Sequence, residues 1–154
     1  MRHHPLPDHD TLPDEKNREL EQAFSLLLPI RRQRLRRCER LQRQAEQVLR
    51  ETECQAAEAE SQLDAARQHY QQLRESFAGR HQSGLQKQER LVGGLTRERE
   101  ASEAVNGQRT QLQQCRTEQM TQQQQVQHAQ QQTQARLRDV EKLEYLMAHS
   151  EALR

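Results

Sequence analysis

Between Ala45 and Phe77, a small or apolar residue recurs at alternating steps of four and three. An α-helix turns once in 3.6 residues, so an average spacing of 3.5 places these residues on one slowly drifting stripe. Such a stripe is buried when a partner helix supplies matching holes, and it therefore predicts a coiled coil. Its members are Ala45, Leu49, Thr52, Ala56, Ala59, Leu63, Ala66, Tyr70, Leu73 and Phe77.

Composition favours elongated helices over a globular domain. Of the 154 residues, 32% are hydrophobic and 3% aromatic, which is too few for a globular core of this size to offset chain entropy. Intrinsic disorder is the other class with such a composition, but it usually carries a large charge imbalance. Here 24 basic residues face 23 acidic ones, so we expect an all-α protein.

Prolines mark the beginning of the helical part. All four lie in the first 29 residues, and the segment from Thr11 combines a hydroxyl cap with a proline and acidic residues. We therefore expect a disordered N-terminal tail over residues 1–11 and a single helical region over residues 12–154. Pro29 is expected to kink or break the first helix.

Glycines mark the expected turn. Four of the five lie between Gly79 and Gly94, and residues 79–84 are the best candidate for a turn. Two long helices on either side of it would pair as an antiparallel coiled-coil hairpin. We expect Gly93 and Gly94 to weaken the second helix near its start or to belong to a longer loop.

The second helix has a more polar seam, because several glutamines and one arginine occupy its heptad positions. Such residues lower stability, so we expect the middle of this helix to be mobile. The seam consists of Val105, Gln108, Leu112, Cys115, Gln119, Gln122, Val126, Ala129, Thr133, Arg136, Val140, Leu143 and Met147. The glutamine runs around it are interpreted as a polar helix face rather than a prion-like tract.

The cysteines and the absence of long apolar runs predict a cytoplasmic location. Cys38, Cys54 and Cys115 include no close-spaced pair, and the heptad register puts Cys38 on the seam but Cys54 on the outer face. We expect reduced thiols rather than a disulfide or a zinc site. No apolar run is long enough to span a membrane, and no signal peptide follows Met1.

Nothing in the sequence indicates catalysis. It contains no glycine-rich phosphate loop, no His, Cys and Asp cluster with metal-ligand spacing, and no prospect of a concave core. His3, His4 and His9 lie in the proline-containing tail, where a solvated tail is a simpler interpretation than a metal site. We expect a protein that is not an enzyme and uses no metal, cofactor or small-molecule substrate.

An arginine-rich run is the most prominent charge feature. Arginine pairs well with phosphate, so a nucleic-acid-binding helix is one interpretation. The nearly neutral net charge of +1, the lack of interleaved aromatic residues and the glutamates that follow argue against it. Docking on an acidic protein surface and plain solvation both remain open. The run comprises Arg31, Arg32, Arg34, Arg36, Arg37, Arg40, Arg43 and Arg50.

Apolar residues are densest near the two free ends of the predicted hairpin. Three successive leucines cover about 200° of a helix circumference, so they cannot all enter one seam. The two clusters either form a small extra core or insert into a partner. Their members are Leu20, Phe24, Leu26, Leu27, Leu28 and Ile30 near one end, and Leu143, Tyr145, Leu146 and Met147 near the other.

Two short stretches carry a resemblance to a known family. The segment 26–34 reads LLLPIRRQR and the segment 138–144 reads RDVEKLE, with a long helical middle between them. This combination resembles the central-stalk proteins of type III secretion, the injectisome YscO/HrpO family and its flagellar relative FliJ. The glutamine-rich second helix and the Gly93-Gly94 pair depart from the family pattern.

The resemblance implies a non-enzymatic stalk or adaptor whose tip enters the hexameric secretion ATPase. It further implies contacts with the cytoplasmic domain of the export gate and with secretion chaperones, peripheral to the inner-membrane secretion apparatus and linked to virulence. The residues implied in partner binding are Leu27, Ile30, Arg31, Arg34, Arg138, Lys142, Leu143 and Leu146. A homodimeric coiled-coil scaffold and an arginine-rich nucleic-acid-binding helix are the alternatives.

Overall fold

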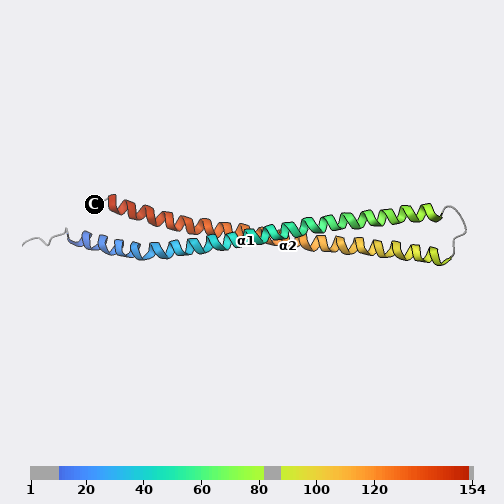
Figure 1. Ribbon diagram of the computed structural model, residues 1–154. Helices are drawn as coiled ribbons and strands as arrows, with labels where there is room; N and C mark the ends of the chain where they lie inside the picture. The colour runs from blue at the N-terminus through green and yellow to red at the C-terminus, as the bar shows by residue number, and fades with distance from the viewer. Residues whose placement is uncertain (1–10, 82–87, 153–154) are drawn as a thin grey trace, which may run out of the picture. The chain divides into compact units, whose positions relative to one another are not determined.

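The computed structural model describes the backbone of residues 11–81 and 88–152 and the side chains of residues 15–79 and 88–150. It contains two α-helices, α1 (Thr11–His81) and α2 (Gln88–Ala152), of 71 and 65 residues. The helices pack against each other as an all-α hairpin (Figure 1), which confirms the predicted fold class.

The helix bounds differ from the predicted ones at the turn. Helix α1 begins at Thr11, one residue before the predicted start, and continues to His81. Gly79, Arg80 and His81 are therefore helical, which corrects the predicted turn at this end. A helical glycine costs only about 1 kcal/mol relative to alanine. The rest of the predicted turn, and the predicted tail over residues 1–10, lie outside the described residues.

Neither Pro29 nor the Gly93-Gly94 pair interrupts a helix, so the predicted break and the predicted longer loop are both wrong. Pro29 is exposed on α1, and the only backbone donor it removes is the one that would reach the carbonyl of Ser25. Gly93 and Gly94 lie in the second turn of α2. Packing against the other helix stabilises long helices beyond their intrinsic propensity, so single unfavourable residues do not end them.

The contacts divide the chain into two units. Unit 1 comprises residues 1–45 and 126–154, and unit 2 comprises Glu46–Gln125. Each unit therefore contains one segment of α1 and one segment of α2.

In unit 2 the predicted seam of α1 is confirmed residue by residue. Every predicted member from Leu49 to Phe77 is buried or half-buried, and every residue between them is exposed. The core is formed by Ala59, Leu63, Val105 and Leu112, with Ala66, Tyr70 and Cys115 packed against it. The seam of α2 in this unit consists of Gly94, Glu98, Ala101, Val105, Gln108, Leu112, Cys115, Gln119 and Gln122.

The contacts of unit 2 also show that the helices are antiparallel. Residues 55–62 of α1 line a shallow groove together with residues 111–118 of α2. Further along α1, Arg74 Nε lies 3.7 Å from Glu98 Oε1. Rising residue numbers in α1 therefore meet falling numbers in α2, as a hairpin requires.

Unit 1 continues the same heptad pattern with more polar members. Val126, Val140 and Leu143 are its buried hydrophobic residues. On α1 the inward heptad positions are Asn17, Glu21, Phe24, Leu28, Arg31, Leu35, Cys38, Gln42 and Ala45, and Glu39 beside them is also half-buried. On α2 the inward positions include Ala129, Thr133, Arg136 and Met147. All thirteen predicted seam positions of the second helix are therefore turned inward in the two units, and Cys38 and Cys54 lie on the predicted faces.

Candidate partner-docking surface

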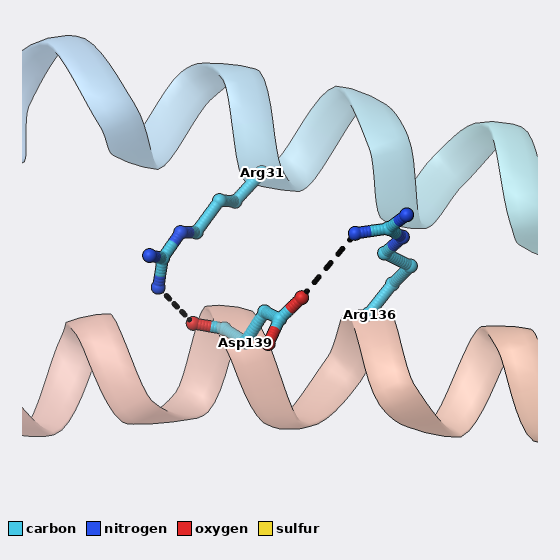
Figure 2. A network of polar contacts seen from close by, with 3 residues as sticks. All are labelled: Arg31, Arg136 and Asp139. Carbon is cyan, nitrogen blue, oxygen red and sulfur yellow. Dashed lines mark hydrogen bonds and ion pairs between the residues drawn. The ribbon is translucent and has the colours of Figure 1, made fainter.

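A polar network centred on Asp139 joins the two helices of unit 1 (Figure 2). Arg31, from α1, donates a hydrogen bond of 2.8 Å from Nη1 to the backbone carbonyl oxygen of Asp139. Arg136, on α2, places Nη1 3.5 Å from Oδ2 of the same residue. The side chain of Asp139 thus holds a neighbour on its own helix, while its backbone accepts from the other.

The heptad register explains why Arg31 turns inward while its neighbours do not. Arg31 occupies a seam position, where its aliphatic stem can cover apolar surface and its guanidinium group can reach a carbonyl. A helical carbonyl has a second lone pair available for such a donor. The next residue, Arg32, lies at the edge of the seam and pairs with Glu144 at 3.1 Å. Both side chains of that pair are about half exposed, so its contribution to stability is small.

Two of the residues predicted to bind a partner are committed to the interior of unit 1. Leu143 retains only 2% of its accessible surface and is part of the core, so it is not accessible to a partner in this structure and its predicted role as a contact residue stays a prediction. It falls on the heptad seam, where burial against α1 stabilises the hairpin itself. Arg31 is half-buried, and its guanidinium group donates a hydrogen bond to the backbone carbonyl of Asp139.

The remaining predicted contact residues are exposed. Leu27, Ile30 and Leu146 keep 41%, 46% and 44% of their surface, although such side chains gain from burial. The basic members Arg34, Arg138 and Lys142 are exposed as well. All six belong to unit 1, so apolar and positively charged groups from both helices are displayed on the same unit.

The apolar clusters near the free ends of the hairpin were predicted either to form a small extra core or to insert into a partner, and their residues are divided between these two possibilities. Phe24, Leu28 and Met147 are half-buried and extend the seam, as a small extra core requires. Leu20, Leu26 and Tyr145 are 49%, 72% and 67% exposed and remain available to a partner. The clusters thus contribute both to the core and to the surface.

The arginine run is outward apart from Arg31. Arg32, Arg34, Arg36, Arg37, Arg40, Arg43 and Arg50 are all exposed. Arg32 pairs with Glu144, and Arg50 donates to the side chain of Gln47 at 2.8 Å. The intervening guanidinium groups form no ion pair with any carboxylate in the described part of the chain.

Sequence reasoning missed two features of this surface. Leu41, which is 48% exposed, follows Leu20 and Leu27 in multiples of seven residues, and counting heptads one position before the seam would have found it. Tyr145 stacks on His149 with ring centroids 5.8 Å apart, at the i and i+4 positions of α2. No signal in the sequence singled out Asp139 as the acceptor of Arg31.

The described residues contain no group of three or more His, Cys, Asp and Glu side chains that could hold a metal ion. The tail with His3, His4 and His9 lies outside them. In neither described helix is there an apolar stretch that could cross a bilayer.

The chain matches no family model, no curated protein sequence and no solved structure. The resemblance to the secretion stalk proteins therefore stays a prediction based on two short stretches of sequence.

Proposed function

We propose that this protein is a non-enzymatic stalk or adaptor of a type III secretion system, docking through unit 1 on the hexameric secretion ATPase. In this proposal it also contacts the cytoplasmic domain of the export gate and the secretion chaperones, on the cytoplasmic side of the inner membrane. It needs no cofactor or metal.

One observation carries the proposal. The two stretches that resemble the family, 26–34 and 138–144, are more than a hundred residues apart in sequence yet belong to the same unit. The hydrogen bond from Arg31 to Asp139 and the ion pair between Arg32 and Glu144 join them directly. A docking tip made from both ends of a hairpin requires this juxtaposition.

The exposed chemistry of unit 1 suits a ring lumen. Arginine forks pair with carboxylates, and exposed aliphatic side chains fill shallow apolar depressions. Arg34, Arg138 and Lys142 supply the charge, while Leu27, Ile30 and Leu146 supply the apolar contacts. Each contact is small, which suits a shaft that must pass from one ring subunit to the next.

The test uses the purified secretion ATPase of the same cell, with binding measured by biolayer interferometry. The double variant R138E/K142E is expected to weaken binding at least about tenfold, a loss of about 1.4 kcal/mol, because it reverses two exposed charges of the docking unit. The matched control is R109E/R116E, which reverses two exposed arginines of α2 in unit 2 and is expected to bind normally.

Apolar contacts are tested in the same way with I30Q, against L95Q as the control in unit 2; both positions are about half exposed. Circular dichroism must show unchanged helicity for every variant. Absence of binding by the natural chain, or equal losses in the two units, would contradict the proposal.

A further inference from the structure

A second apolar row runs along α1 in unit 1, beside the seam. Leu20, Leu27 and Leu41 are 49%, 41% and 48% exposed and are separated by multiples of seven residues. Arg34 occupies the remaining heptad position of the row. Ile30, three residues after Leu27, is 46% exposed and lies on the same side of the helix. Scattered exposed leucines are normal, whereas a heptad row of them is a binding pattern.

The row is not used by α2. Each member lies one position before a half-buried seam residue, so it borders the contact with α2 without being covered by it. A helix with one neighbour needs two apolar positions per heptad, and a third adjacent position widens the face enough for a second neighbour. In unit 2 the same heptad position begins with Val48, which is 39% exposed, and then holds Gln55, Gln62, His69 and Ser76. The apolar row therefore ends at the start of unit 2, and nearly all of it belongs to unit 1.

The charge around the row is positive. Arg34 lies within it, and heptad arithmetic puts Arg37 and Arg40 successively farther from the seam on the same side. All three are exposed and form no ion pair with a carboxylate in the described part of the chain. Glu39 lies on the other flank of the seam. A helix seated on the row would therefore meet leucines with guanidinium groups between and outside them.

A second copy of this chain is a poor occupant of the row. A two-fold contact with the helices parallel would bring Arg34 and Arg37 of one copy against the same residues of the other, and like charges in an interface cost several kcal/mol. With the helices antiparallel, Arg34 would face Leu27 of the other copy, and the row would supply no carboxylate to pair with either set of arginines. An acidic helix would instead gain bidentate arginine–carboxylate pairs along with the apolar contacts.

We propose that the face of α1 formed by Leu20, Leu27, Ile30, Arg34 and Leu41 binds an amphipathic helix of another protein whose apolar stripe is flanked by aspartate and glutamate. Leu27, Ile30 and Arg34 are also among the residues proposed to contact the ATPase, so the two partners would compete for this part of unit 1. The inference itself does not depend on the secretion assignment. It names the chemistry of a lateral partner of unit 1.

The probe is a fluorescent synthetic peptide of about four heptads, with leucine at the two seam positions and glutamate at the flanking ones. Its lysine analogue is the charge control. Fluorescence anisotropy against the full chain is expected to show binding of the acidic peptide only, weakening as salt rises through the range that shortens the Debye length.

Two variants separate the apolar and the charged contributions. L27Q/L41Q and R34E/R37E are each expected to lower the affinity for the acidic peptide at least about tenfold. The control L91Q/L95Q changes two comparably exposed leucines of unit 2 and is expected to bind as the natural chain does. Unchanged circular dichroism establishes that each variant remains folded.

Several results would overturn the proposal. If the acidic peptide fails to bind, or if the lysine analogue binds equally well, the result contradicts the proposal. Dimerisation of the chain that L27Q/L41Q abolishes would assign the row to a second copy. Tight binding of a duplex oligonucleotide that is insensitive to L27Q/L41Q and displaces the peptide would assign the arginines to nucleic acid. Because the peptide assay involves no secretion protein, its failure is distinguishable from failure to bind the ATPase.

Discussion

Leu137 and Leu143 lie six residues apart on α2 of unit 1, but their surroundings differ sharply. Leu137 is 42% exposed, whereas Leu143 is 2% exposed and is the most deeply buried large side chain among the described residues. Replacing either leucine with alanine removes the same atoms from the same helix. The two replacements therefore compare a buried leucine with an exposed one.

We expect L143A to lower the free energy of unfolding by about 2–5 kcal/mol, since it leaves a cavity in the seam as well as losing apolar burial. L137A is expected to cost less than about 1 kcal/mol, because much of its side chain is already in water. Urea unfolding followed by circular dichroism measures both. Equal losses would mean that Leu143 is not a core residue, and would restore it as a candidate contact residue.

Arg31 illustrates what a residue-level reading of the sequence can and cannot predict. Its heptad position is a seam position, and that could be counted from the sequence. Its acceptor could not, because the partner is a backbone carbonyl, which every residue possesses. The choice of Asp139 depends on the axial offset between the helices, and this offset is set by packing of the whole seam.

At the scale of the helices, the heptad spacing predicted the buried face correctly, whereas proline and glycine did not predict where the helices end. The alternating steps of four and three predicted every inward residue from Leu49 to Phe77. Pro29 was expected to kink or break the first helix, and Gly93-Gly94 to weaken the second or belong to a longer loop. Neither the break nor the loop occurs, because packing along a long partner offsets the local cost of these residues. The boundary near Gly79 was misplaced by three residues for the same reason.

The polar part of the α2 seam is expected to open more readily than the apolar part. In unit 2, Ala101, Val105 and Leu112 are buried, whereas Gln119 and Gln122 are only half-buried. Few buried apolar contacts mean a low free energy of local opening. Amide hydrogen exchange should therefore be faster over residues 117–124 than over residues 101–112, by about tenfold or more if the difference reaches about 1.4 kcal/mol.

Replacing both glutamines with leucine supplies the check on this expectation. Q119L/Q122L should slow exchange over residues 117–124 and leave residues 101–112 unchanged. If the two segments exchange at the same rate in the natural chain, the seam composition does not determine local stability.

For the molecule as a whole, pairing within one chain removes the main reason for self-association. Each helix finds the other in the same chain, so the heptad seams are occupied without a second copy. Light scattering after size-exclusion chromatography should give a mass near the 18.2 kDa of one chain at micromolar concentration. A stable mass of twice that value would favour the alternative of a homodimeric scaffold, and L27Q/L41Q would then show whether the second copy uses the lateral row.

The division into two units also bears on how the protein should be labelled. The start of α1 and the end of α2 both belong to unit 1, the unit that carries the proposed contacts, whereas the end of α1 and the start of α2 belong to unit 2. An affinity tag or fluorescent fusion at either terminus is thus attached to the docking unit and competes for its surface. A tag inserted between His81 and Gln88 is attached to unit 2 and leaves the face of unit 1 unaltered. A thiol dye would serve equally at the exposed Cys54 of unit 2 once Cys38 of unit 1 and Cys115 have been replaced.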